Sequence, residues 1–427
     1  MKRIIRWTAL LVCLLLCAAP VLAGGRAFTG YSIKSSATYE LAEGVTYERY
    51  HLIPPDRNVH RGQRIYLLDI RPGAHVRLVA SPSGERIHKG LATLTSILDY
   101  EKERTGATIL GGVNGDFFDT AAGGPVGYLK REGEWLVGGE FPESWACGMT
   151  CGGQPVIGQP RLKMTLTLPD GSQYAVNALN GLRADLTRGE SAPSNAKTAR
   201  EDNRLVLFTP AFGTKTATQA GGTEVRLRAD GPLTDGKPLT AAVEEVTVQR
   251  DKGGMALEAG MMVLSAVGEQ AAALKTLRPG DRVTLALTVD DAFSEVDNAV
   301  GGGRPDGGPL LLWDGRPTDL EAARAASDDI QYFYRHHART AMGIRADGSY
   351  FLLVIEGNRT GSYGMTLEEA QTLLLDLGAY SAMNLDGGPS STMAILLDGK
   401  MKLVSDTTGG QGRQSTIGSA LYLVAEE

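Results

Sequence analysis

Short apolar runs separated by glycine and proline characterise the first hundred residues. Residues 65–70 and 76–80 are apolar runs of strand length, and turn residues follow each of them. Over 91–104 the apolar spacing changes to that of an amphipathic helix, and Gly106 stands where such a helix would stop. The pattern therefore predicts an N-terminal region, 24–106, with a layer of strands and one helix.

The middle of the chain alternates short apolar runs with turn residues. One segment, 269–277, has helical spacing, and it ends before the turn Arg278-Pro279-Gly280-Asp281. The other apolar runs predict strands at 162–168, 205–208, 224–227, 243–248 and 283–289. We expect a β-rich insertion over about 160–300.

The last third combines strands with a second helix. Asp347-Gly348 lies between two apolar runs and predicts a hairpin. Thr366 and Glu369 have the spacing of a capping box at the start of a helix. An apolar run then enters the polar loop 386–392. These elements predict an α+β fold, in which a mixed β-sheet has flanking helices, with a main domain at 107–424.

Composition and charge exclude one class of partner. The 427 residues include 54 glycines and only 6% aromatic residues, which agrees with many tight turns between short strands. The formal charge is −6, and the chain has no basic block of the kind that follows a phosphate backbone. We therefore expect no nucleic-acid partner.

The first 23 residues have the pattern of an export signal. Lys2, Arg3 and Arg6 precede the apolar stretch 9–19, and small residues lead to a cleavage site after Ala23. The alternatives are an uncleaved anchor, for which the apolar stretch is short, and lipoprotein cleavage at Cys17. Since no later segment is long and apolar enough to span a bilayer, we expect a mature protein with no stable membrane span. Its predicted location is secreted, or periplasmic within the cell envelope.

Two cysteines, Cys147 and Cys151, follow the predicted signal. In an oxidising compartment, a pair this close in sequence is most simply explained as a local disulfide. A zinc site would need further ligands.

The loop 386–392 carries the densest group of chemical side chains in the chain. It contains Asp386, two glycines whose backbone N–H groups can converge on an anion, and hydroxyl groups that add donors. Asn384 precedes it at the end of the predicted strand. The anion-binding residues would be Gly387, Gly388, Ser390 and Ser391. The alternative is an ordinary Asp-Gly-Gly turn with Ser and Thr as local caps.

A second loop repeats this theme. Asn114 and Asp116 have the same spacing as Asn384 and Asp386, again beside glycine at the end of a strand. The segment 335–340 adds His337, Arg339 and Thr340, and its cationic groups suit a bidentate grip on phosphate. The alternative for this segment is a solvated surface.

Taken in order, these segments resemble the phosphodiester glycosidase family. The matching motifs are Asn114-Gly115-Asp116-Phe117-Phe118, Gly123-Gly124-Pro125-Val126-Gly127, Gly301-Gly302-Gly303 with Asp314-Gly315, Arg339-Thr340-Ala341-Met342-Gly343, Gly364-Met365-Thr366-Leu367 and Asn384-Leu385-Asp386-Gly387-Gly388-Pro389-Ser390-Ser391-Thr392-Met393. The resemblance covers about 107–424. It departs from the family pattern at Ala338, where the family prefers Pro, at Glu356, where it prefers Asp, and at Pro389, where it prefers Gly. Pro389 removes one N–H from the loop.

The resemblance implies hydrolysis of the bond between a sugar anomeric carbon and a phosphodiester oxygen. The implied substrates are N-acetylglucosamine-1-phosphodiesters or related glycans of the cell envelope or exopolysaccharide. Asp386 and Asp116 are then the candidate catalytic carboxylates, and Arg339 neutralises the phosphate. The candidate substrate-binding residues are Asn114, Asn384, Gly387, Gly388, Ser390, Ser391, Thr340, His337, Glu356 and Arg413.

Two other functions fit the same residues. The acids and histidines could hold a divalent cation for hydrolysis at phosphorus, although no dense ligand motif is present. The departures at Pro389 and Glu356 also fit a non-catalytic glycan-binding protein of the cell envelope. No cofactor is required by the motifs themselves, and the expected partner is a glycan or sugar phosphate.

Overall fold

The computed structural model describes residues 25–56, 61–120, 122–139, 142–181, 183, 203–218, 220–249, 254–301, 310–321, 334–358, 361–406 and 413–426. The predicted signal peptide lies outside the described residues, as do Gly302 and Gly303 of the glycine motif.

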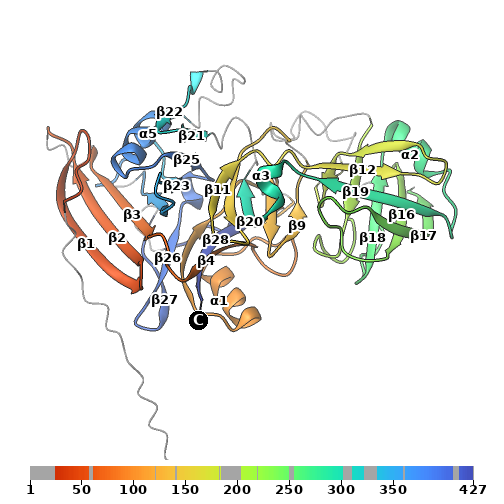
Figure 1. Cartoon of the computed structure of the whole chain (residues 1–427), viewed down its shortest axis with the longest axis horizontal. Helices are drawn as coiled ribbons and strands as arrows, with labels where there is room; N and C mark the ends of the chain where they lie inside the picture. The colour runs from red at the N-terminus through yellow and green to blue at the C-terminus, as the bar shows by residue number, and fades with distance from the viewer. Residues whose placement is uncertain are drawn as a thin grey trace, which may run out of the picture.

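Two sheets form the part of the molecule that carries the candidate loops. The first, sheet A, has eight strands in the order β1 (Ser32–Ala42), β2 (Val45–Ile53), β3 (Gln63–Ile70), β24 (Tyr350–Ile355), β23 (Arg339–Ile344), β25 (Ser381–Asn384), β21 (Leu310–Trp313) and β22 (Arg316–Pro317). The second, sheet C, has five strands in the order β27 (Lys400–Leu403), β26 (Met393–Leu397), β5 (Ile109–Asn114), β28 (Ser419–Ala425) and β4 (Val76–Pro82). Each sheet therefore pairs segments from both ends of the chain (Figure 1).

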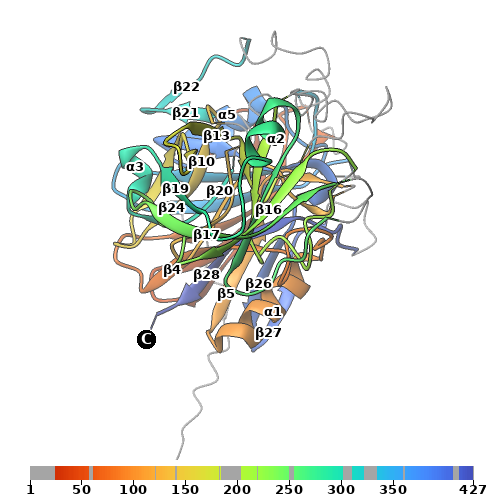
Figure 2. The ribbon, with the colours of Figure 1, turned by 90° about the vertical axis from the view of Figure 1, so that its right-hand side faces the viewer.

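The middle of the chain forms two further sheets. Sheet F has five strands in the order β11 (Pro155–Gly158), β10 (Ala146–Thr150), β20 (Val296–Gly301), β8 (Tyr128–Arg131) and β9 (Glu134–Val137). Sheet G has eight in the order β13 (Gln173–Val176), β12 (Lys163–Thr167), β19 (Arg282–Thr288), β17 (Leu239–Val248), β16 (Thr223–Ala229), β18 (Met261–Ala266), β15 (Leu205–Phe208) and β14 (Ala178–Leu179). A small pair, β6 (Phe118–Asp119) with β7 (Gly124–Pro125), follows the Asp116 loop. Sheet G lies at one end of the molecule, seen face-on in Figure 2.

The helices are short, and their ends agree with the sequence signals. Helix α1 (Leu94–Thr105) ends at Gly106, which has a left-handed φ of 71°. Helix α5 (Leu367–Asp376) begins with the predicted capping box between Thr366 and Glu369. The other two described α-helices are α2 (Gly268–Leu274) and α3 (Asp291–Ser294).

The predicted α+β class is wrong, because the described part of the chain is mostly β and is built from several sheets. Its few helices only cover sheet faces: α1 packs on sheet C and α5 on sheet A. One cause is the hairpin of β1 and β2, because the exposed strand β1 contains mostly polar residues and thus lacks an apolar run. An exposed polar strand of this kind carries a weaker periodic signal than an amphipathic helix does.

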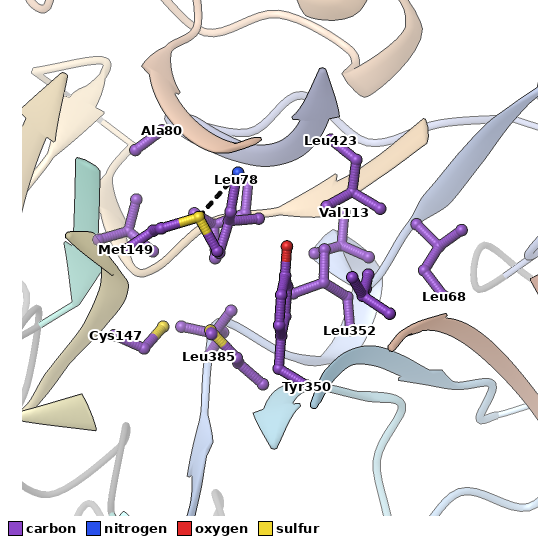
Figure 3. Close-up of a cluster of buried hydrophobic side chains, with 14 of the residues drawn as sticks. Leu68, Leu78, Ala80, Val113, Cys147, Met149, Tyr350, Leu352, Leu385 and Leu423 are labelled. Carbon is purple, nitrogen blue, oxygen red and sulfur yellow. Dashed lines mark hydrogen bonds between the residues drawn. The ribbon is translucent and has the colours of Figure 1, made fainter. Parts of the chain in front are cut away.

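The main core lies between sheets A, C and F. Its side chains include Leu68 and Leu352 from sheet A, Val113 and Leu423 from sheet C, and Met149 from sheet F (Figure 3). The Met149 sulfur accepts a hydrogen bond of 3.3 Å from the backbone N of Leu78. Because these sheets share one core, the ends of β5 and β25 meet, and the two polar loops that follow them are brought together.

Candidate active site

Asn114 joins the two candidate loops. It is the last residue of β5, it is 1% exposed, and its Nδ2 donates to the backbone carbonyl of Asp386 at 2.7 Å and to that of Gly115 at 3.0 Å. Its Oδ1 accepts from the Thr340 hydroxyl at 2.7 Å and from the Thr392 backbone N at 3.1 Å. The amide thus ties β5 to β23 and to both ends of the loop 386–392. These contacts favour a positioning role for Asn114 and Thr340 over direct contact with a sugar.

The Asp386 carboxyl occupies an environment that favours its neutral form. Burial raises its pKa to about 7, and the charge of Asp116 acts in the same direction, whereas a hydrogen bond from Ser390 and the backbone of Gly387 lower it. Asp116 is 4% exposed. The structure therefore brings the two acids that the sequence motifs singled out near enough for the charge of one to raise the pKa of the other.

The loop 386–392 donates hydrogen bonds to the carboxyl group of its own first residue, Asp386. Residues Gly388–Ser390 form a 3₁₀ turn in which Gly388 has a φ of 62°. The backbone N of Gly388 donates to Ala338 at 2.8 Å, and that of Ser391 donates to Gly388 at 3.2 Å. The backbone N–H of Gly387 bonds to Asp386, so these N–H groups already have partners within the protein. The geometry thus favours a loop that positions the Asp386 carboxyl group over the predicted binding site for an external anion.

Arg339 lies beside this loop in the sheet, but its guanidinium group is directed elsewhere. Thr340 points toward Asn114, and neighbouring residues of a strand point to opposite faces. The Arg339 Nε donates to the carbonyl of Met365 at 2.9 Å, and Nη2 donates to that of Arg335 at 2.7 Å. The side chain is 3% exposed, and burial lowers its pKa to about 10. The structure therefore gives Arg339 contacts on the face covered by α5.

Asn384 belongs to the same face as Arg339. It is paired with Ala341 across β23 and β25, is 1% exposed, and donates from Nδ2 to the carbonyl of Leu385 at 2.7 Å. His337 is half-buried, and its backbone pairs with Met365 in both directions, at 3.3 and 3.0 Å. Both residues thus flank the loop from sheet A.

Glu356 and Arg413 lie outside the loop, one before it and one after it in the sequence. Glu356 follows β24, is 1% exposed, and its Oε1 accepts from the Tyr66 hydroxyl at 2.7 Å and from the backbone N of Asp406 at 2.8 Å. Burial, with the Glu356 charge, raises the pKa of Tyr66. Glu356 therefore anchors the segment that follows β27. Arg413 is exposed.

The predicted disulfide is absent, because Cys147 and Cys151 are both free thiols. Cys147 lies inside β10 and is buried beside Leu385, while Cys151 follows the strand and is exposed (Figure 3). Four residues of extended chain span roughly 13 Å, far beyond the separation that a disulfide allows. Burial raises the pKa of the Cys147 thiol, and the charge of Asp116 adds to this effect.

We expect alkylation of the native protein to modify Cys151 alone. The exposed thiol can react through its thiolate, whereas Cys147 is buried and its raised pKa keeps it protonated. Peptide mass mapping under non-reducing conditions should find one labelled cysteine in the folded protein and two after denaturation. An intact Cys147–Cys151 linkage would contradict this arrangement.

Sequence reasoning missed two groups at this site. Thr392 donates its backbone N to Asn114, and the buried thiol of Cys147 lies close enough to Asp116 for that charge to affect its pKa. Thr392 is part of the quoted Asp386 motif, so the motif contained a signal for it. Cys147 had none, because only the packing of sheet F brings it near Asp116.

The described residues contain no group of three or more His, Cys, Asp or Glu side chains arranged to hold a metal ion. Among the helices described, none has the length and apolar character needed to cross a membrane.

Comparison with a family model confirms the resemblance over part of the chain. The model of the phosphodiester glycosidase family matches residues 237–424, a stretch that includes Arg339, Glu356 and the Asp386 loop. The Asp116 loop lies outside the matched residues.

The chain also resembles one curated protein over a short stretch of sequence and two solved structures in fold. An uncharacterized protein derived from the SPbeta prophage of Bacillus subtilis is 30% identical over 107 residues, which are 23% of this chain and 16% of that protein. The chain thus matches about a sixth of this relative's length. A hypothetical protein from Synechocystis has a TM-score of 0.69 at 20% identity, covering 93% of this chain and 68% of that one. A Burkholderia pseudomallei protein described as exported has a TM-score of 0.66 at 20% identity, covering 95% of this chain and 99% of that one.

Proposed function

We propose that this protein is an exported glycosidase that hydrolyses the bond between a sugar anomeric carbon and a phosphodiester oxygen. Its substrates would be N-acetylglucosamine-1-phosphodiesters or related glycans of the cell envelope or exopolysaccharide. The family match over 237–424 supports the reaction class. The signal-like residues 1–23 support export.

The pair of Asp386 and Asp116 is the observation that carries this proposal. Glycoside hydrolysis generally uses two carboxyl groups in different protonation states. Burial and the charge of Asp116 raise the pKa of Asp386 to about 7, so Asp386 exchanges its proton near neutral pH. Such a pair, with one carboxyl group whose pKa is strongly raised, has the chemistry of an acid and base site.

The nature of the leaving group assigns the two roles. A phosphodiester oxygen departs as a stable anion and needs little protonation, so the harder step is the attack of water on the anomeric carbon. In this mechanism Asp386 takes a proton from that water as the new carbon–oxygen bond forms and the bond to the phosphate oxygen breaks. Asp116 stabilises the positive charge that develops on the sugar.

The products formed from a panel of sugar-1-phosphodiesters test this function. In ¹⁸O-labelled water, we expect purified mature protein to place the label on the released sugar and to leave the phosphate unlabelled. Label in the phosphate would instead show hydrolysis at phosphorus. Saturable binding without turnover would show a glycan-binding protein.

A further inference from the structure

A cationic cavity lies apart from the carboxyl pair, between the loop that follows β4 and the segment that follows β15. Its volume is about 630 Å³, within the range of small-molecule sites. The lining residues with charged or titratable side chains are Glu85, Arg86, His88, Lys89, Tyr100 and Lys215. Three permanent cations therefore face one carboxylate, in a protein whose net charge is −6.

The three cations are available to a ligand. Arg86, Lys89 and Lys215 are exposed, and within the described part of the chain none of them forms an ion pair. Three cations that converge with a single carboxylate, Glu85, repel one another, and an oxyanion in the cavity would relieve this repulsion. Guanidinium and ammonium groups are the usual side-chain donors to phosphate.

His88 adds a polar group that is fixed in place. Its ring stacks on Phe212 with centroids 4.9 Å apart, and its backbone N donates to the carbonyl of Phe212 at 2.9 Å. The Nδ1 atom is buried and has no hydrogen-bond partner among the described residues. Burial lowers the pKa of His88, with Lys89 acting in the same direction and Asp119 against it.

The cavity is linked to the catalytic loop by the backbone. The N of Lys89 donates to Ala122 at 2.7 Å, and the N of Gly90 donates to Gly123 at 2.8 Å. A Cβ at Gly123 would lie 2.6 Å from the Lys89 Cα, so the two loops touch at this point. The segment that contacts Lys89 is the turn between β6 and β7, and this pair of strands directly follows the loop that carries Asp116.

We propose that this cavity binds a phosphate-type oxyanion through Arg86, Lys89, Lys215 and His88. The occupant is either a further phosphate of a substrate with several phosphodiester links, a possibility that rests on the proposed function, or free inorganic phosphate. In both cases the anion is held beside the β6–β7 turn, which follows the loop that carries Asp116.

Titration with inorganic phosphate, observed at the His88 imidazole by NMR, tests the site directly. We expect a saturable shift of the His88 resonances, with affinity at least tenfold weaker in the triple variant Arg86→Gln, Lys89→Gln, Lys215→Gln. The matched control Arg71→Gln, Lys237→Gln, Lys400→Gln removes the same charge from exposed cations elsewhere and should bind as the unmodified protein does. The absence of a saturable shift, or equal affinity in the triple variant, would overturn the proposal.

Kinetics distinguish the two sources of the anion. If the anion belongs to the substrate, the triple variant should raise KM about tenfold for a glycan with several phosphodiester links and leave KM for a single-link substrate unchanged. If phosphate binds at His88 while both KM values stay the same, the ligand is free phosphate. Because the NMR titration needs no turnover, it tests this site independently of the glycosidase activity.

Discussion

The variant Asp386→Asn is expected to lower kcat by roughly 10²-fold or more, the scale of lost acid–base assistance. Asparagine keeps the shape of the side chain and can still bond to Ser390, but it cannot take a proton from the attacking water. In the unmodified protein, kcat should rise with pH around 7, because burial raises the pKa of Asp386 to about 7. The variant should lose that rise. Steady-state rates across pH on the best substrate of the panel measure both effects.

Thermal unfolding separates this loss from a loss of structure. The folded state binds the Asp386 proton more tightly than the unfolded state does, since the pKa is raised from an ordinary value of 3.8. The stability from this proton is fully present below about pH 4 and is lost as the pH rises through about 7. Asp386→Asn has no such titrating group, so its stability does not fall in this way. The Tm of the variant minus that of the unmodified protein should therefore increase as the pH rises from about 4 to about 7.

Asp398→Asn is the matched control for this substitution. Asp398 also precedes a glycine in a turn, and its side chain is 62% exposed. We expect unchanged kcat and Tm, because asparagine is an equally good turn residue. A folded Asp386→Asn protein with near-normal kcat would remove Asp386 from the catalytic pair and would leave Asp116 as the candidate.

The variant Asn114→Asp is expected to destabilise the fold by about 2–6 kcal/mol and to lower kcat as well. Aspartate keeps an acceptor for Thr340 and Thr392 but replaces the NH₂ group that donates to the carbonyls of Asp386 and Gly115. Two buried carbonyls would then face an oxygen instead of a donor, at a cost of roughly 1–3 kcal/mol each. Chemical denaturation and steady-state kinetics measure the two effects.

Asn203→Asp provides the control with the same chemical change. The Asn203 Oδ1 accepts from the backbone N of Glu269 at 2.6 Å, and aspartate keeps that acceptor at the start of α2. We therefore expect little change in stability or rate. If Asn114→Asp behaved like this control, the hydrogen bonds of Asn114 would not be what holds the two loops in place.

The sequence predicted correctly those features that depend on neighbouring residues in the chain. The stop at Gly106, the capping box at Thr366 and Glu369 and the hairpin at Asp347-Gly348 all depend on residues close in sequence, and the structure confirms each. The fold class was not predicted correctly, because exposed polar strands such as β1 lack an apolar run. The high proportion of β-strand depends on the pairing of segments that are distant in the sequence.

The cysteines and Arg339 show where sequence reasoning stops. Four-residue spacing suggested a disulfide, but the pairing of β10 with β11 and β20 extends the chain and separates the thiols. Arg339 was predicted to grip phosphate, whereas strand alternation and burial under α5 direct its guanidinium group to backbone carbonyls. Both outcomes depend on neighbours that are remote in sequence.

The sequence alone singled out the candidate residues for chemistry: two Asn-x-Asp motifs, each at the end of a strand and beside glycine. Tertiary structure decided that these motifs meet, because sheets A and C share one core and Asn114 bridges them. It also decided their electrostatics, since the pKa of a carboxyl group depends on burial and on the charge of its spatial neighbour. Neither burial nor that neighbour can be read from positions 270 residues apart in the chain, as Asp116 and Asp386 are.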